Sequence, residues 1–144
     1  SGWKDVVIPP VTPYGVATRL LRHARAPGER DRVVCFRGNS AVSPLPQVRA
    51  KYLSLNETVR PEVLNLAGLP GTDIGHSARN HELLLGRCVF CLAPQGASAY
   101  SSRLFEALFA GCIPVVLSDH LRLPFEGVVP WRELAIRWPM RRIR

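Results

Sequence analysis

The sequence lacks several features that would assign a chain of 144 residues to a common class. It has no run of about 18 consecutive apolar residues, the length a helix needs to span a membrane. It has no second CxxC motif and no closely spaced histidine pair, which excludes the usual zinc patterns. No aromatic residues alternate with the basic ones and no nucleic-acid module signature occurs, so we expect no nucleic-acid partner.

Lysine is nearly absent, since Lys4 and Lys51 are the only two, and the formal net charge of +8 therefore comes from arginine. Arginine offers fixed bidentate donors that match phosphate, sulfate or carboxylate. Three readings are open: an anionic sugar-nucleotide site, a surface for a polyanionic glycan or nucleic acid, or a genome that favours arginine. We attribute most of the excess to the third.

The four cysteines each lie in or beside an expected strand, where they suit a role as small buried hydrophobic residues. They are Cys35, Cys88, Cys91 and Cys112. Cys88 and Cys91 are three residues apart on one strand, so we expect their side chains to point to opposite faces. Whether the cysteines are free or form a disulfide between neighbouring strands stays open, and with it the redox compartment. We expect no bound metal.

A strand, a helix and a second strand follow one another closely between residues 88 and 117. An apolar run over 88–93 is typical of a parallel strand covered on both faces, and Pro94 ends it. After a small-residue loop around Gly96, Ser101 or Ser102 can cap a helix that Gly111 ends. Residues 113–117 form the second strand. The connection places Gly96 and Ser102 at the carboxyl edge of a parallel sheet, where open sheets bind ligands.

Two charged residues interrupt the apolar sequence of that helix. Arg103 and Glu106 are three residues apart, so they share one face near the amino end, which favours an anion. A nucleotide diphosphate fits such a site, with Arg103 on phosphate and Glu106 accepting hydrogen bonds from ribose hydroxyls. The alternative is a helix-surface ion pair that contributes at most about 0.5 kcal/mol.

Further candidates follow the ends of two other expected strands. Residues 33–37 form a strand that ends with Arg37 and Gly38, and a glycine there lets backbone amides approach a phosphate. The alternative is an ordinary turn. Asp119 and His120 follow the strand over 113–117 and are candidates to bind a sugar attached to that nucleotide or to position a second substrate, although Asp119 alternatively caps the next turn. We expect His76 and His81 to be solvated.

The rest of the chain gives weaker signals. Residues 5–8 resemble a terminal strand that Pro9 and Pro10 end. We expect helices within residues 14–26, 47–55, 77–86 and 132–136, and a loop over 56–75 that contains a short strand at 63–67.

Three segments resemble the C-terminal part of the exostosin family of glycosyltransferases. They are FCLAPQG at 90–96, SRLFEALFAGCIPVVLSD at 102–119 and LPFEGVVPW at 123–131. KDVVIPP at 4–10 and VVCFRG at 33–38 match less well, and residues 40–75 match poorly. The resemblance implies a GT-B fold of two facing Rossmann-like lobes, of which the C-terminal lobe holds the sugar nucleotide. It makes Glu106 the match to the family's ribose-contacting acid and Arg103 the match to its phosphate-side base.

The resemblance therefore predicts an α/β fold with a parallel sheet flanked by helices. Residues 1–30 would end the N-terminal lobe and form the interlobe linker, and residues 31–144 would form the donor-binding lobe. The implied reaction is inverting transfer from a nucleotide diphosphate sugar to a polysaccharide or glycan acceptor, with no obligatory metal, and no D-x-D motif is present to hold one.

The resemblance also predicts a Golgi enzyme that faces the lumen, with a membrane anchor upstream of this sequence. The acceptor lobe would be missing here, so we expect this piece alone to be inactive. The alternative is a non-catalytic lobe that binds a nucleotide or an anionic glycan.

Overall fold

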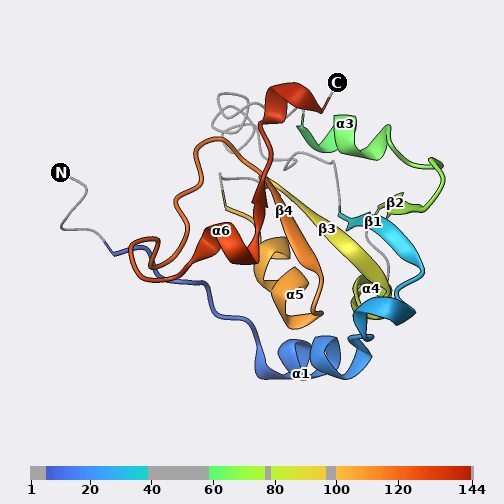
Figure 1. The fold of residues 1–144 in the computed structure, drawn as a ribbon, viewed down its shortest axis with the longest axis horizontal. Helices are drawn as coiled ribbons and strands as arrows, with labels where there is room; N and C mark the ends of the chain where they lie inside the picture. Colours follow the sequence, from blue (N-terminus) through green and yellow to red (C-terminus); the bar gives the residue numbers. More distant parts are fainter. Residues whose placement is uncertain (1–5, 39–58, 77–78, 97–99, 144) are drawn as a thin grey trace, which may run out of the picture.

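The computed structural model describes residues 6–38, 59–76, 79–96 and 100–143, and these form a parallel sheet with helices on both sides. Five parallel strands lie in the order β2-β1-β3-β4-β5 (Figure 1). The strands are β1 (Arg32–Arg37), β2 (Thr72–Gly75), β3 (Cys88–Pro94), β4 (Ile113–Leu117) and β5 (Ile136–Arg137). The predicted Rossmann-like parallel sheet is confirmed.

The helices divide between the two faces of the sheet. They are α1 (Tyr14–His23), α3 (Val59–Leu64), α4 (His81–Leu85), α5 (Arg103–Phe109) and α6 (Trp131–Leu134), with 3-10 turns η1 (Pro27–Glu29) and η2 (Met140–Arg142). On one face α1, α4 and α5 bury Leu20, Leu85 and Ala107. On the other face α3 buries Val59 and Val63. Helix α3 and η2 both lie at the top of Figure 1.

Alternation along each strand explains why both faces are covered. Phe36 of β1 and Leu117 of β4 pack in the α3 cluster, whereas their neighbours Cys35 and Val116 pack on the opposite side. Successive side chains of a strand point to opposite faces, so the three strands β1, β3 and β4 supply residues to both cores. The sheet is buried on two sides, as its apolar runs predicted.

The central β3–α5–β4 unit was predicted closely. Gly111 has φ of 64°, the left-handed conformation that a glycine adopts at low cost where a helix ends. The helix begins at Arg103, and Ser101 Oγ accepts a hydrogen bond from the Arg103 amide at 3.4 Å. Phe105 also packs edge-on against Trp131, with ring centroids 6.4 Å apart, and so links α5 to α6.

The four cysteines form two disulfides, Cys35–Cys88 and Cys91–Cys112. All four are buried in the cluster under α1, α4 and α5. The expectation that Cys88 and Cys91 face opposite sides is therefore wrong. Cys88 is the first residue of β3, directly after the turn that leaves α4, where the alternation of the strand has only begun.

Several weaker predictions for the first half of the chain need correction. Residues 6–8 are not part of a strand, and Val7 instead accepts a hydrogen bond from the Phe125 amide at 3.1 Å. The expected strand at 63–67 begins within helix α3, because Val59 and Val63, four residues apart, both pack against the sheet. Strand β2 was missed. The helix expected at 47–55 lies outside the described residues.

Near the end of the chain, α6 stops at Leu134 and the sequence enters β5, which pairs with β4. The helix expected at 132–136 is therefore shorter and begins one residue earlier. Helix α4 covers His81–Leu85 of the predicted 77–86. None of the helices in the described parts of the chain has the length and apolar content needed to cross a membrane.

Helix α1 is fixed to this sheet by a close backbone contact. Leu20 is fully buried, and a Cβ atom at Gly86 would collide with the carbonyl oxygen of His23. The Arg25 amide donates to the carbonyl oxygen of Gly86 at 3.2 Å. The end of α1 and the turn after α4 therefore need the glycine between them. The assignment of residues 1–30 to another lobe and a linker stays a prediction.

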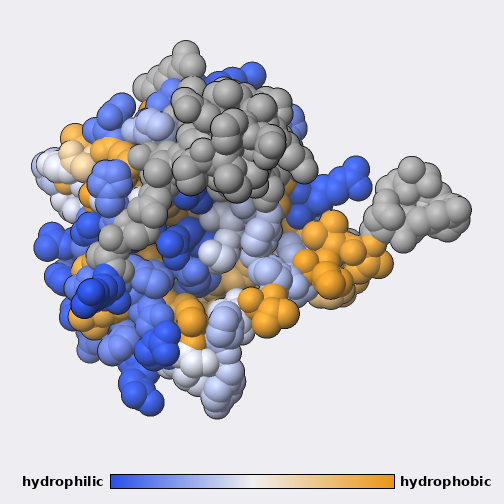
Figure 2. Space-filling view, turned by 180° about the vertical axis from the view of Figure 1, so that it is seen from behind, coloured by the Kyte–Doolittle hydropathy of each residue, from blue (hydrophilic) through white to orange (hydrophobic). Residues whose placement is uncertain are grey.

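Exposed apolar side chains gather near the N-terminal end of the described chain (Figure 2). Val6 and Ile8 are 69% and 70% exposed, and Val128 is 86% exposed. The Phe125–Val7 hydrogen bond joins the two segments that carry these side chains. This apolar surface lies at one end of the molecule, in the loop between β4 and α6 and the segment before α1.

Candidate functional site at the carboxyl edge of the sheet

The strand order locates the point on the sheet where a ligand is expected. The connection after β1 leads to β2 on one side, whereas the connection after β3 leads to β4 on the other. In open α/β sheets ligands bind at the carboxyl ends of the two strands where the order reverses. Here those strands are β1 and β3. Gly38 follows β1 directly, and Gly96 lies two residues after the end of β3.

Both glycines are in close contact with their surroundings. A Cβ atom at Gly38 would lie 2.6 Å from Cζ of Phe36, and the Gly38 amide donates to the carbonyl oxygen of Gly75 at 3.2 Å. A Cβ atom at Gly96 would lie 3.1 Å from Nη2 of Arg60. The backbone at the switch point therefore has side chains packed directly against it.

Arg103 and Glu106 form an ion pair at the beginning of α5. The pair is largely shielded, because the two side chains are 21% and 12% exposed. Ser102 Oγ donates to Glu106 Oε1 at 3.1 Å, and Nε2 of His81 lies 3.6 Å from Glu106 Oε2. The ion pair considered from the sequence exists, but it belongs to a half-buried cluster rather than to a solvated helix face.

Electrostatics keep Glu106 ionised. Burial alone would raise the pKa of its carboxyl, but His81 and the positive charge of Arg103 outweigh burial and lower this pKa to about 2. Burial and the charge of Glu106 together raise the pKa of the nearby Tyr100 phenol to about 12. At neutral pH the cluster thus holds a carboxylate that can accept hydrogen bonds and a phenol that keeps its proton.

Sequence reasoning missed Arg60, which reaches the same edge from α3. Its Nε donates to the carbonyl oxygen of Gln95 at 3.0 Å, and its guanidinium carbon lies 6.0 Å from the centre of the Phe36 ring. Arg60 was missed because residues 56–75 were interpreted as a loop. The signal that would have found it is the helical spacing of Val59 and Val63 on either side of it.

The structure places Arg37 beside β2. Its guanidinium pairs with Asp73, whose own strand neighbours β1, and the two side chains are 24% and 15% exposed. Arg37 Nε is buried and has no hydrogen-bond partner among the described residues. Part of this side chain is therefore committed to the sheet, and its contact with a phosphate stays a prediction.

Asp119 and His120 lie at the carboxyl end of β4, on the far side of β3 from the switch point. Asp119 Oδ1 accepts a hydrogen bond from the Met140 amide at 3.2 Å and so ties this strand end to η2. This hydrogen bond goes to a turn that is distant in sequence, not to the turn that follows Asp119 directly. His120 is exposed. Their contact with a donor sugar or acceptor stays a prediction.

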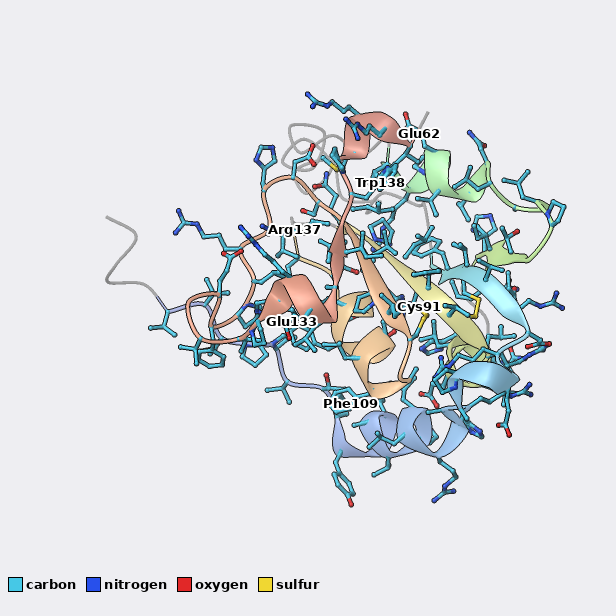
Figure 3. The ribbon with its side chains drawn as sticks, in the orientation of Figure 1. Glu62, Cys91, Phe109, Glu133, Arg137 and Trp138 are labelled. Carbon is cyan, nitrogen blue, oxygen red and sulfur yellow. A yellow bond between two sulfur atoms is a disulfide. The ribbon has the colours of Figure 1, made fainter. Side chains whose placement is uncertain are left out.

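Two hollows border this second part of the edge. One of about 140 Å³ lies beside Asp119 and is lined in part by Arg137 and Trp138 (Figure 3). A wider groove of about 700 Å³ lies between α6 and the loop before it, with Trp131 in its wall and Glu133 and Arg137 at its rim. Trp131 Nε1 donates to the carbonyl oxygen of Pro124 at 2.7 Å, which fixes this wall.

The described residues contain no cluster of three or more histidine, cysteine or acidic side chains that would hold a metal ion. The cysteines are all committed to disulfides. The charged groups at the switch point are instead arginines and the carboxylates that pair with them.

A parallel sheet of this order, with an arginine–glutamate pair beside the ends of its central strands, defines a Rossmann-like α/β domain built to present charged groups at its carboxyl edge. The comparison with family models is more specific. The chain belongs to the exostosin GT47 family, whose domain matches residues 1–144.

Individual relatives agree with this family. The chain is 35% identical over 134 residues to a probable glucuronosyltransferase of Oryza sativa subsp. japonica, covering 92% of this chain and 30% of the relative. It is 33% identical over 135 residues to a probable glucuronoxylan glucuronosyltransferase of Arabidopsis thaliana, covering 92% and 28%. A probable beta-1,4-xylosyltransferase of Arabidopsis thaliana is 46% identical over 50 residues, covering 35% and 12%. The chain thus spans less than a third of the length of these relatives.

Proposed function

We propose that this chain is the donor-binding lobe of an inverting glycosyltransferase that transfers a sugar from a nucleoside diphosphate to a polysaccharide. Family membership and the glucuronosyl- and xylosyltransferase relatives support this class of reaction. From those relatives we infer a donor that carries glucuronic acid or xylose. The observation that carries the proposal is Glu106, an ionised and largely buried carboxylate held by Arg103 and Ser102 beside the switch point.

In this proposal Glu106 accepts hydrogen bonds from the ribose hydroxyls, and Arg103 binds a phosphate. The backbone at Gly38 and Gly96 approaches the diphosphate together with Ser102 and Arg37. Asp119 and His120 lie farther along the edge, where the donor sugar or the acceptor would reach them. Because Glu106 is already ionised and oriented, binding a ribose requires little rearrangement of the site.

The proposed reaction is a single displacement at the anomeric carbon. A hydroxyl oxygen of the acceptor forms the new bond while the bond to the diphosphate oxygen breaks, and a general base takes the hydroxyl proton. Arginines at the edge neutralise the charge that develops on the leaving diphosphate, a role that a metal ion plays in other transferases. This lobe alone would bind the donor without transferring it.

We also propose that the enzyme works in the Golgi lumen, held by an anchor outside this sequence. The two buried disulfides support an oxidising compartment. The apolar surface around Val6, Ile8 and Val128 supports contact with a second lobe, because contiguous exposed apolar patches commonly mark such contacts. Residues 1–30 would then lead from that lobe into this one.

A titration of the donor nucleotide tests the proposed site. Glu106→Gln removes the charge with little change in shape, and we expect it to weaken UDP, UDP-glucuronate and UDP-xylose binding at least tenfold by calorimetry. Glu82→Gln is the matched control, because Glu82 lies on the neighbouring α4 and pairs with Arg19 instead. Equal affinity for the wild type and Glu106→Gln, or no binding by either, would contradict the proposal.

A further inference from the structure

Arg60 connects the ends of the two strands at the switch point. It lies on α3 between Val59 and Val63, which are 2% and 0% exposed and anchor the helix to the sheet. Its Nε donates to the carbonyl oxygen of Gln95, the residue after β3, at 3.0 Å. The guanidinium also lies over the ring of Phe36 in β1, at 6.0 Å from the ring centre. Contacts with both central strands therefore define its position.

The loop after β3 is shaped to admit this guanidinium. A Cβ atom at Gly96 would lie only 3.1 Å from Arg60 Nη2, a distance tighter than ordinary van der Waals contact. The missing side chain at position 96 lets the guanidinium lie against the backbone. The same glycine precedes the segment that leads into α5 and Arg103, so Arg60 and Arg103 approach the edge from opposite faces of the sheet.

Two positive charges at one edge repel each other. Burial lowers the pKa of the Arg60 guanidinium, and the positive charge of Arg103 lowers it further. Repulsion of this kind is relieved when an anion binds between the two groups. Arginine is suited to this role because its paired N–H groups match two phosphate oxygens.

We propose that Arg60 is the second guanidinium of the diphosphate subsite, and that Arg60 and Arg103 bind the two phosphates from the two faces of the sheet. This inference rests on the proposed function, because it assumes a nucleoside diphosphate at the switch point. Arg60 then determines how strongly the lobe prefers a diphosphate to a monophosphate. It also places a donor contact on α3, in the part of the sequence that resembles the family least.

The competing role for Arg60 is purely structural, as a link between α3, Phe36 and Gln95. The two roles differ in how binding depends on the number of phosphates. If Arg60 is only a structural link, replacing it changes the affinities for UDP, UMP and uridine by similar factors, or changes none of them. If Arg60 contacts a phosphate, replacing it lowers the affinity for UDP most and the affinity for uridine least.

Calorimetric titration of UDP, UMP and uridine into wild type and Arg60→Gln tests the inference. Glutamine keeps an N–H donor for Gln95 but removes the charge. We expect UDP affinity to fall at least tenfold, uridine affinity to stay within twofold, and the UDP-to-UMP affinity ratio to fall at least fivefold. Arg22→Gln, a charge removed from the exposed side of α1, serves as the matched control and leaves the ratio unchanged.

The outcomes separate this inference from the proposed function. If Arg60→Gln keeps the wild-type ratio while Glu106→Gln weakens UDP binding, the role of Arg60 is wrong and the donor site stands. If the wild type binds no UDP, both fail. If circular dichroism shows that Arg60→Gln does not fold, Arg60→Lys takes its place in the titrations, because lysine retains the charge without the bidentate geometry. We expect Arg60→Lys to lower the ratio by a smaller factor, and an unchanged ratio would overturn the inference.

Discussion

The two halves of the carboxyl edge use their polar side chains in different ways. Near β1 and β3, Glu106 is paired with Arg103 and half-buried, so these charged groups are held in place by one another. Near β4 and β5, Asp119 bonds the Met140 amide and His120 is exposed. The first half presents preorganised charge, and the second uses its carboxylate to hold the chain. Two carboxylates at one edge of the sheet therefore have different roles in the structure, which depend on their partners.

The largest expected loss of stability comes from removing the disulfides. All four cysteines lie in β1, in β3 or just before β4, so each bond joins two neighbouring strands of the sheet. Cys35 and Cys88 are separated by 53 residues, and Cys91 and Cys112 by 21. Loop-closure entropy predicts a loss of about 4 kcal/mol for the first bond and about 3 kcal/mol for the second. Denaturant unfolding with and without reductant measures this loss. A variant with all four cysteines replaced by serine should not respond to reductant.

If reduction leaves the unfolding midpoint of the wild-type protein unchanged, the two disulfides do not stabilise the sheet that carries the edge, and this prediction is wrong.

A smaller effect is expected from acid, through Glu106. The pKa of this carboxyl is about 2 in the folded protein and near 4.3 in an unfolded chain. The ionised carboxylate therefore stabilises the fold at any pH above the pKa of the unfolded chain. This stabilisation is lost as the pH falls through the pKa of Glu106 in the folded protein. The free energy of unfolding of the wild type should exceed that of Glu106→Gln by roughly 2 kcal/mol at pH 6. This difference should shrink toward zero near pH 2.

Urea unfolding of both proteins across this pH range gives the measurement. The groups that face Glu106 are His81 from α4 and Arg103 from its own helix, with Tyr100 and Glu82 nearby. Taking the difference between the two proteins removes the contribution of carboxyls that do not interact with Glu106, such as Asp31. A difference that does not vary with pH would show that the shielded ion pair contributes nothing to stability.

The smallest effect is expected in the second half of the edge. Asp119→Ala removes the hydrogen bond to the Met140 amide and should cost about 1 kcal/mol of unfolding free energy. We expect UDP affinity to change less than twofold, because the Asp119 carboxylate is engaged with η2. If UDP affinity falls as far as in Glu106→Gln, the two halves form one site and the contrast between them disappears.

The sequence predicted best where local signals and tertiary structure agree. The apolar run of β3, the helical spacing of α5 and the glycine at position 111 define one crossover unit, and the spacing of Arg103 and Glu106 places them together. Strand β2 was missed because four residues are too few to show a local pattern. Its strand conformation depends on its pairing with β1.

The partners of the charged groups were harder to predict. Asp73 meets Arg37 only because β2 and β1 are neighbours, and His81 meets Glu106 only because α4 packs beside α5. The disulfide pairing likewise depends on the strand order. None of these contacts has a local signature in the sequence.

The contact between Gly86 and the carbonyl of His23 has a mechanical consequence. It makes α1 part of the same rigid body as the sheet, since a hinge at this place would have to separate two backbones that touch. If the proposed second lobe precedes this domain, any rotation between the two would therefore have to pivot ahead of Tyr14, where the hydrogen bond between Val7 and Phe125 also holds the segment. Pro9, Pro10 and Pro13 restrict backbone rotation in that segment, so such a pivot would have few torsions to turn about.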